Sequence, residues 1–495
     1  VYTSRPMSVR VRYAPSPTGL QHIGGVRTAL FNYFFARAEG GSFVLRVEDT
    51  DQKRYDERAL QDIFDTFSWL GISWDEGPQV GGPYEPYFQS QRTELYRKFA
   101  QELLDSGNAY YCYTSDKQQE EEAGAEEQKK KGGYDRSSRG LTPEQRAEYE
   151  AQGITPVVRL KVPLEGSTEV EDIVLGRIKK KNKDLPPDPI LLKSDGFPTY
   201  HLANVVDDHL MGITHVMRAQ EWVPSTPIHV LIYHALGWET PTFCHLPMVM
   251  GKDGQKLSKR HGSTSLVDFR KEGYLPEAII NYISLLGWAY DDSREFFTRE
   301  ELEELFDVNK LNKAPAVFDY KKLGWFNGQY IRKRTPEELA QMLLPYMQEA
   351  GLIGDDPSAE ERSRFEGMMP LIQERLTLLS EAPQLLRFLY EEVSGYAPEE
   401  LIPKKLDGEQ TLAYLKRSRE ILREMEGSDE EALEERFRAE AEAMEAKLGN
   451  LLMPLRVALT GSRVSPPLFG SMAFLGWEES LQRIDRAIAL LEERS

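Results

Sequence analysis

The chain is poor in cysteine, in long uncharged runs and, relative to acidic residues, in basic ones. Two cysteines among 495 residues, Cys112 and Cys244, exclude a disulfide framework and fit a reducing compartment. Residues 278–290 form one of the longer uncharged runs, which is too short for a bilayer and predicts a buried helix. The residues before Met7 show no charged-then-apolar pattern of a secretory signal. We therefore expect a cytoplasmic protein with no membrane partner.

The shortage of basic residues leaves a formal net charge of −19. Taken alone, this charge disfavours a nucleic-acid partner, but phosphate contacts depend on local clusters of Lys and Arg. The charges are unevenly spread. Residues 177–183 are strongly basic, whereas Ser428 to Glu431 predicts a capping box that opens a very acidic helix. The distribution of charge, and not its sum, therefore decides which partners are feasible.

What the sequence does contain is a pair of segments suited to a nucleotide. Arg12 to Gly19 (RYAPSPTG) and His22 to Gly25 (HIGG) predict a strand end, a stiff turn and a helix start, whose N–H groups attract phosphate. Lys256 to Arg260 (KLSKR) predicts a compact basic loop behind Gly251 and Gly254. Each segment alone is more often an ordinary turn or a solvated loop. Together they indicate an enzyme that binds a nucleoside triphosphate without a P-loop.

Periodicity places the first segment in a strand–helix–strand unit. Residues 8–13 alternate as a half-buried strand does, residues 24–39 have helical spacing, and residues 42–47 predict the next strand. Ligands of such sheets bind beyond the carboxyl ends of the strands. A chain of 495 residues is too long for one core, so we expect two to four domains.

Two further regions have different patterns. Between about 111 and 190, a charged low-complexity run (residues 118–131) and short strands indicate an insertion into the α/β domain. The α/β pattern then resumes, with a helix expected to begin at residues 225–227. After about residue 330, helical periods dominate, for example in residues 337–349 and 363–379.

These motifs resemble the signature motifs of class I aminoacyl-tRNA synthetases. Their exact form resembles that of the glutamyl-tRNA synthetases. His22 to Gly24 is similar to the HIGH signature, and Lys256 to Arg260 is similar to the KMSKS loop. The resemblance extends from about residue 8 to the end and is highly specific. Further matching segments are residues 46–51, 194–209, 325–332 and 454–461.

The resemblance implies a reaction in two steps. Glutamate attacks the α-phosphate of ATP to give glutamyl-adenylate and pyrophosphate, and the terminal adenosine of tRNA(Glu) then accepts glutamate on its 2′-OH. Because no protein nucleophile is needed, catalysis should depend on positioning and on neutralising phosphate charge. The implied catalytic residues are His22, Lys256 and Lys259. The implied ATP-binding residues are Pro17, Thr18, Gly19, His22, Gly24, Gly25, Lys256, Leu257, Ser258, Lys259 and Arg260.

Glutamate carries two carboxylates and one ammonium, so its pocket needs two cations and one anion. By family position, Arg12 and Arg218 bind the carboxylates, which suits the planar guanidinium, and Glu48 faces the ammonium. The sequence does not decide which arginine binds the side-chain carboxylate. Gln220 stands where the family usually has an acidic residue, and we expect it to tune the site. The remaining implied glutamate-binding residues are Ala14, Ser16, Tyr200 and Asn204.

Some relatives bind a structural zinc ion in the insertion through a Cys-x-Cys pair and a later Cys-x-His pair. Here only Cys112 is present, and Thr114, Ser138 and Gly140 stand at the other positions. One sulfur cannot build a tetrahedral site, so we expect no zinc and no metal bound by the protein itself. Mg²⁺ should arrive with ATP, held by phosphates and water.

The resemblance also implies two tRNA-binding surfaces. The insertion would contact the acceptor end, and the helical region would contact the anticodon. Arg375 is the candidate reader of the third anticodon base, because it lies in the corresponding helical segment; arginine can pair with guanine or donate to a pyrimidine. Whether tRNA(Gln) is also charged, with an amidotransferase complex, stays open; the family suggests a monomer. The other implied tRNA contacts are Arg54, Lys179, Lys180 and Lys181.

Three alternatives differ in testable ways. Glutaminyl-tRNA synthetase has an anticodon region rich in β-barrels, whereas this C-terminal third has helical patterns, and Arg218 suits a second carboxylate. A shortened paralogue that glutamylates a modified tRNA base would lack the helical region. A silent tRNA-binding protein would have broken signature motifs, and both are intact here.

The predicted fold is an α/β Rossmann-type catalytic domain, split by an α+β insertion and followed by a mostly α-helical C-terminal anticodon-binding region. The predicted boundaries are an N-terminal extension (1–6), the first half of the catalytic domain (7–110), the insertion (111–189), the second half of the catalytic domain (190–249), a stem-contact domain with the KLSKR loop (250–332) and two helical anticodon-binding subdomains (333–393 and 394–495).

Overall fold

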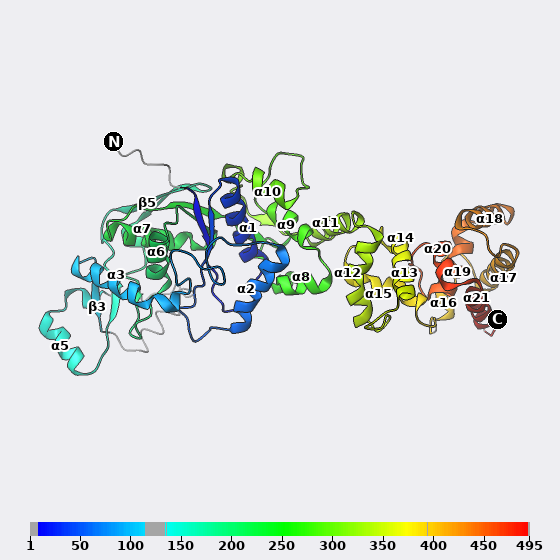
Figure 1. The fold of residues 1–495 in the computed structure, drawn as a ribbon, viewed down its shortest axis with the longest axis horizontal. Helices are drawn as coiled ribbons and strands as arrows, with labels where there is room; N and C mark the ends of the chain where they lie inside the picture. The colour runs from blue at the N-terminus through cyan, green and yellow to red at the C-terminus, as the bar shows by residue number, and fades with distance from the viewer. Residues whose placement is uncertain (1–7, 114–133, 135, 394, 494–495) are drawn as a thin grey trace. The chain divides into compact units, whose positions relative to one another are not determined.

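A computed structural model describes residues 8–113, 134, 136–393 and 395–493. The predicted extension 1–6, Thr114 and the low-complexity run 118–131 lie outside these residues. The described chain forms two compact units, one within Val1–Arg270 and Pro276–Tyr320, the other within Lys271–Leu275 and Lys321–Ser495 (Figure 1). In the part of the chain that is described, no helix is long and apolar enough to cross a bilayer.

The first unit contains the predicted strand–helix–strand unit. β1 (Arg10–Tyr13) pairs in parallel with β2 (Ser42–Leu45), and α1 (Ile23–Ala38) connects them. The sequence prediction is therefore confirmed. Since both strands run in the same direction, the Arg12-to-Gly19 turn and the segment after β2 leave the sheet at the same edge.

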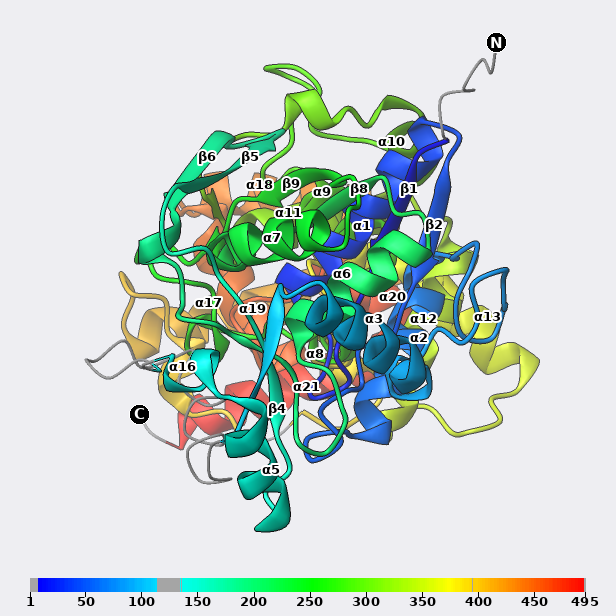
Figure 2. The same cartoon turned by 90° about the vertical axis from the view of Figure 1, so that its left-hand side faces the viewer.

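A second parallel pair lies beside the first. β8 (His215–Ala219) pairs in parallel with β9 (Thr242–Leu246). The backbone N–H of Thr214, just before β8, donates to the carbonyl of Arg10 at 2.9 Å, so β8 and β1 are neighbours. Figure 2 shows the strands from β6 to β2 side by side. The carboxyl ends of β1 and β8 therefore meet.

A hairpin from the predicted insertion also belongs to this sheet. β5 (Ser167–Asp172) pairs in parallel with β9, with Asp172 opposite Phe243, and β6 (Gly176–Lys181) pairs antiparallel with β5. Alternating sequence patterns reveal a strand but not its partner, so this pairing was not predictable. The other strands of this region form a separate antiparallel sheet in the order β3 (Ala109–Cys112), β4 (Val157–Leu160) and β7 (Ile190–Leu192).

Helices predicted in the first unit are present, with one correction. The helix expected at residues 225–227 is α7 (Thr226–Ala235). The buried run 278–290 is only partly helical, because α9 (Pro276–Ser284) ends before Gly287, whose φ of +100° is incompatible with a helix. The remaining elements up to residue 320 are α2 (Glu57–Leu70), α3 (Thr93–Asp105), α5 (Pro143–Ala151), α6 (Tyr200–Leu210), α8 (Leu266–Glu272), α10 (Arg299–Leu305), β10 (Val249–Met250) and β11 (Ala316–Val317).

The second unit is helical, as predicted. Leu415, Leu455 and Ile484, from three different helices, are fully buried in one apolar core. Its helices are α11 (Tyr320–Arg332), which begins at the end of the first unit, α12 (Pro336–Glu349), α13 (Ala359–Gly367), α14 (Met369–Ile372), α15 (Ala382–Leu386), α16 (Pro398–Leu401), α17 (Gly408–Glu424), α18 (Glu430–Ala443), α19 (Leu448–Thr460), α20 (Leu468–Leu475) and α21 (Trp477–Glu492).

Two helix predictions in this unit were wrong in detail. The helix expected over 363–379 is broken: α13 ends before Pro370, which lacks a backbone N–H and lies in the first turn of α14 instead. Arg375 therefore lies in a turn after α14. The acidic helix α18 is capped by Asp429, which accepts from the Ala432 N–H, rather than by Ser428 in a capping box. Both residue types cap well, so the sequence did not distinguish them.

Candidate functional site

His22 caps the N-terminus of α1 with its own ring. Its Nδ1 accepts from the backbone N–H of Gly24 at 3.1 Å and of Gly25 at 3.3 Å. The ring proton must therefore be on Nε2. Desolvation, and then the charge of Lys256, lower the pKa of His22, so the imidazole is neutral near pH 7. The sequence predicted that the helix N–H groups face a phosphate directly; here His22 occupies two of them and presents Nε2–H instead.

The turn before His22 presents polar and small groups to solvent. Ser16, Thr18 and Gly19 are exposed, Ala14 is half-buried and Pro17 is buried. The Thr18 N–H donates to the carbonyl of Ser16 at 2.9 Å, which tightens the turn. These predicted residues therefore lie together, beyond the carboxyl end of β1.

The basic loop is held in shape by one carboxylate. Asp253 binds Arg260 through Oδ2 and His261 through Oδ1, both at 3.0 Å. Leu257 is half-buried and its N–H donates to the carbonyl of Val249 at 3.0 Å, which closes the loop at its base. The exposed lysines are therefore carried by a folded loop.

The structure brings the two signature segments together. The Ile23 N–H donates to the carbonyl of Thr264 at 3.0 Å, so the segment after the basic loop pairs with the start of α1. Lys256 pairs with Glu221, and both charges affect the pKa of His22. Ser258 and Lys259 are exposed on the same loop.

Arg12 is buried and already neutralised by a carboxylate that the sequence analysis missed. Its Nε and Nη2 donate to the two oxygens of Asp208 at 3.0 and 3.2 Å. Arg46, fully buried, donates to Asp208 Oδ1 at 2.8 Å. Burial alone would raise the pKa of Asp208, but the charges of Arg12 and Arg46 keep it below its usual value. Asp208 therefore holds Arg12 in place from α6.

Glu48 and Asn204 lie next to this cluster. Arg46 Nη2 donates to Glu48 Oε1 at 3.2 Å. Burial raises the pKa of Glu48, and the charges of Arg46 and Arg12 oppose this shift only in part. In the amide orientation that satisfies both neighbours, Asn204 donates to Asp208 and accepts from Arg12, each at 3.3 Å. An added cation beside Glu48 would therefore stabilise its ionised form.

Arg218 is buried without direct contact to a carboxylate among the described residues. Its Nη1 donates to the hydroxyl of Tyr200 at 3.0 Å and lies 3.2 Å from His229 Nδ1, and Nη2 donates to Thr226 at 2.9 Å. Its Nε donates to His245 at 3.1 Å. A guanidinium held only by neutral acceptors is suited to an anionic ligand, because a ligand carboxylate supplies the missing charge.

The predicted tRNA contacts lie on exposed surfaces. Arg54 pairs with Asp51 at 2.6 Å, and Lys179 pairs with Glu169 at 2.7 Å. Lys180 and Lys181 are exposed on β6, an edge strand of the sheet that contains β8 and β9.

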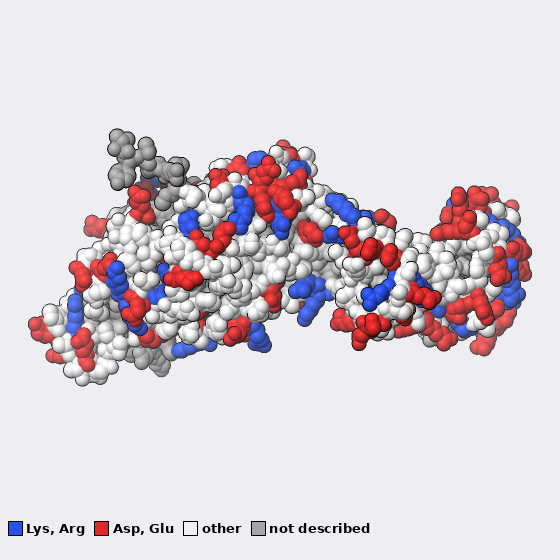
Figure 3. All heavy atoms as spheres, in the orientation of Figure 1, with Lys and Arg blue, Asp and Glu red and all other residues white. Residues whose placement is uncertain are grey.

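In the second unit, Arg375 is exposed and its charge lowers the pKa of Arg456, after desolvation, so the two cations are close. A pair of close cations is suited to an anion such as phosphate. By contrast, α18 exposes Glu430, Glu431 and Glu434, and Figure 3 shows acidic side chains over the C-terminal helices on the face in view. That acidic surface is unsuited to RNA.

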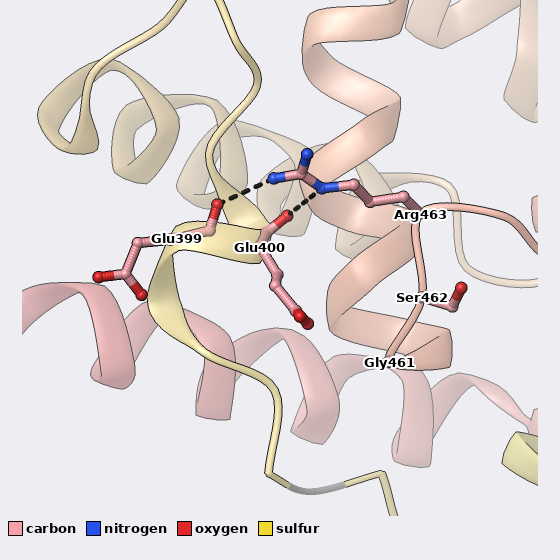
Figure 4. Close-up of a pocket in the computed structure, with 5 residues that line it drawn as sticks. All are labelled: Glu399, Glu400, Gly461, Ser462 and Arg463. Atoms are coloured by element: carbon pink, nitrogen blue, oxygen red, sulfur yellow. Dashed lines mark hydrogen bonds between the residues drawn. The ribbon is translucent and has the colours of Figure 1, made fainter.

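A polar hollow of about 460 Å³ lies elsewhere in the second unit, lined by Glu399, Glu400, Gly461, Ser462 and Arg463 (Figure 4). Arg463 donates to the carbonyls of Glu399 and Glu400 at 3.0 and 3.2 Å. These carbonyls end α16, so Arg463 acts as a helix cap here.

The positions that hold zinc in some relatives are only partly within the described residues. Across the described ranges, no group of three or more His, Cys, Asp or Glu side chains could hold a metal ion. Cys112 is buried, and a buried carboxylate, Asp188, binds Arg139 and accepts from the Tyr110 hydroxyl at 2.7 Å. Thr114 is not among the described residues.

Comparisons with known proteins cover nearly the whole chain, and they agree with one another. Residues 8–325 match the family model described as tRNA synthetases class I (E and Q), catalytic domain, and residues 338–488 match an anticodon binding domain. A glutamate–tRNA ligase from Treponema denticola is 56% identical, covering 98% of this chain and 99% of that protein. One from Borreliella burgdorferi is 52% identical, covering 97% and 98%. A solved glutamate–tRNA ligase from Elizabethkingia meningosepticum, in complex with its amino acid, has a TM-score of 0.83 at 34% identity, covering 98% of this chain and 100% of that one.

Proposed function

This chain belongs to the glutamate–tRNA ligases, class I tRNA synthetases, and from that premise we propose how its residues perform the reaction. The enzyme activates L-glutamate with ATP and transfers it to tRNA(Glu). The helical second unit, matched by an anticodon-binding model, agrees with this family and removes the rival that lacks a helical region. The division into seven segments made from the sequence, with a stem-contact domain at 250–332, stays a proposal.

The observation that carries the site assignment is that Arg218 is buried and that no carboxylate of the described residues contacts it. We assign it, with Tyr200, to one carboxylate of glutamate. Arg12, held by Asp208, still has its two Nη1 N–H groups for the other carboxylate. Glu48, whose pKa burial raises, accepts the ammonium. Ala14, Ser16 and Asn204 complete the pocket. This arrangement matches two cations and one anion to the charges of glutamate.

ATP is assigned to the two signature segments. Nε2–H of His22 and the exposed Lys256 and Lys259 supply positive ends for the phosphates. Mg²⁺, carried by the phosphates, would neutralise part of their charge, which fits a site without a described metal cage. The charge that develops as the carboxylate attacks the α-phosphate is stabilised by groups already in place. Pro17, Thr18, Gly19, Gly24, Gly25, Leu257, Ser258 and Arg260 shape this site.

Lys259→Ala is expected to slow adenylate formation by about two to three decades, because one cation at the transferring phosphate is lost. Lys259 is exposed, so the melting temperature should stay within about 2 °C. Single-turnover formation of glutamyl-adenylate, with tRNA present, measures the rate. Lys252→Ala, on the exposed side of the same loop, is the control. Equal rates for Lys259→Ala and the wild type would remove Lys259 from the catalytic set.

Arg375→Gln is expected to relax discrimination between tRNA(Glu) and tRNA(Gln), because the guanidinium donors that distinguish the third anticodon base are lost. The kcat/KM ratio for the two tRNAs should fall about fivefold or more, since a good base contact contributes roughly 1–3 kcal/mol. Arg362→Gln, another exposed arginine of the second unit, is the control. Equal weakening on both tRNAs would defeat this assignment. Contacts of Arg54, Lys179, Lys180 and Lys181 with the acceptor end are proposed on charge and exposure.

ATP–pyrophosphate exchange tests the whole proposal, with glutamate and with glutamine, each with and without tRNA(Glu). Exchange that depends on glutamate and tRNA supports it, and exchange with glutamine would overturn it. We further propose that the protein is a cytoplasmic monomer, in which both cysteines stay free. We also propose that it binds no zinc, because the single sulfur of Cys112 cannot build a tetrahedral site. Charging assays on tRNA(Gln) decide whether a partnership with an amidotransferase is required.

A further inference from the structure

A buried carboxylate lies behind Arg218, one imidazole ring away. Asp172 Oδ2 lies 2.6 Å from His245 Nδ1, and Arg218 Nε donates to His245 Nε2 at 3.1 Å. All three side chains are buried. Because guanidinium only donates, His245 Nε2 must accept, so the ring proton is on Nδ1 and is donated to Asp172. The three groups therefore form a relay from carboxylate through neutral imidazole to guanidinium.

Asp172 is fixed firmly enough to set this arrangement. Its Oδ1 accepts from the backbone N–H groups of Val174 and Leu175 at 3.0 and 2.8 Å, and its Oδ2 accepts also from the His245 N–H at 3.0 Å. These hydrogen bonds and that of the His245 ring more than offset burial and keep the pKa of Asp172 below its usual value. Asp172 is therefore a carboxylate with no freedom to rotate.

The relay resolves a conflict in the glutamate pocket. A buried guanidinium needs a compensating anion, but a carboxylate in direct contact would take the N–H groups that a ligand needs. Asp172 compensates Arg218 through His245. Four of the five N–H groups of Arg218 are held by His245, Tyr200, His229 and Thr226, which leaves one on Nη2. Tyr200 accepts from Arg218, so its own hydroxyl proton stays available to a ligand.

The three residues stand on adjacent strands of one sheet. Arg218 on β8 is directly opposite His245 on β9, and Asp172 ends β5, whose partner is β9. A site built on strands is held more closely than one on loops. The hairpin inserted between the two halves of the catalytic domain therefore contributes a residue to the support of the pocket.

We propose that Asp172 and His245 are one positioning unit, which fixes the orientation of Arg218 and the tautomer that faces it. Neither residue contacts glutamate. The unit acts on glutamate affinity through Arg218, so this inference rests on the proposed role of Arg218 as a glutamate clamp. Without the carboxylate, the ring proton of His245 can move to Nε2. Two N–H donors, one on His245 and one on Arg218, then face each other and their hydrogen bond is lost.

Asp172→Asn tests the unit, because it keeps the shape of the side chain and removes its charge. The KM for glutamate is expected to rise about ten- to one-hundredfold, because a buried N–H of Arg218 would lose its acceptor on His245. The KM for ATP should stay within about twofold. The ¹⁵N shifts of the His245 ring should also change from those of a proton on Nδ1. His245→Gln, which breaks the link to Asp172, should raise the KM for glutamate in the same way.

Asp188→Asn is the matched control, since Asp188 is equally buried and accepts from arginine, tyrosine and a backbone N–H. It should lower the melting temperature but leave the KM for glutamate unchanged. If Asp172→Asn and Asp188→Asn affect this KM alike, the unit is structural only. Where Asp172→Asn fails to fold, His245→Gln decides by the same comparison of the two KM values.

Arg218→Gln, measured in parallel, separates the two levels of inference. An unchanged KM for glutamate in Arg218→Gln would overturn the clamp and the positioning unit with it. A raised KM in Arg218→Gln, with normal values in Asp172→Asn and His245→Gln, would overturn only the positioning unit.

Discussion

Replacing Arg218 with glutamine is expected to lower kcat/KM for glutamate by about two to three decades. The guanidinium is buried, and no carboxylate of the described chain contacts it, so a ligand carboxylate bound there depends on its charge. Glutamine keeps a donor but removes that charge. Aminoacylation of tRNA(Glu) over a range of glutamate concentrations measures the loss. The KM for ATP should be unchanged, because the signature segments are intact.

Arg58→Gln is the control for this experiment. The Arg58 side chain is 89% exposed and pairs with Asp56 on the surface. Exposed pairs contribute little, so its substitution should leave both kcat and KM at wild-type values. Should Arg218→Gln retain wild-type kcat/KM as well, the assignment of Arg218 to glutamate is wrong.

Asp208→Asn is expected to destabilise the first unit by about 3–5 kcal/mol, as removal of one partner from a buried ion pair does. Asp208 accepts from Arg12 and Arg46, and its side chain is fully buried. The amide removes the carboxylate that Arg12 contacts and leaves Arg46 with Glu48 and Asp207 only. Urea unfolding at pH 7, followed by a probe in the first unit, measures the free energy. Asp56→Asn, at an exposed N-cap where both residue types cap well, should change it by less than about 1 kcal/mol.

The pH dependence of stability gives a second measure of how much the Asp208 carboxylate contributes to the free energy of unfolding. Its pKa is lowered in the folded chain, so the unfolded chain binds the proton more readily. The stabilisation is therefore complete above the unfolded pKa of about 3.9 and is lost as the pH falls through the lower folded value. The wild type should lose stability as the pH falls below about 4, and Asp208→Asn should show a shallower loss. Parallel profiles would contradict the role of Asp208.

The parts of the fold that local patterns encode were predictable. The alternation before Pro15 and the helical spacing after Gly24 gave the first strand and helix, and both are present. Pro370 was a visible signal for the break after α13, because proline cannot continue a helix, but the apolar spacing around it suggested one long helix.

The partners of the site residues were not predictable from local patterns. Arg12 and its counter-ion Asp208 are 196 positions apart, and Asp172 and His245 are 73 apart. Such pairs depend on which strands become neighbours, and strand pairing has no local signal. Family resemblance named the groups that are proposed to face the ligands. It did not name the carboxylates that stand behind them and hold their charges.

The lysines of β6 have a further consequence, since β6 is an outer strand of the sheet that contains β8 and β9. An outer strand exposes unpaired backbone groups on which another chain can add, and charged side chains there keep such chains apart. Lys179, Lys180 and Lys181 thus disfavour the addition of another strand to this edge, independently of the RNA contacts proposed for them. If these lysines were replaced by neutral residues, a loss of activity could come either from weaker RNA binding or from self-association through the strand edge. Charge reversal to glutamate removes the attraction for phosphate and keeps the strand edge protected.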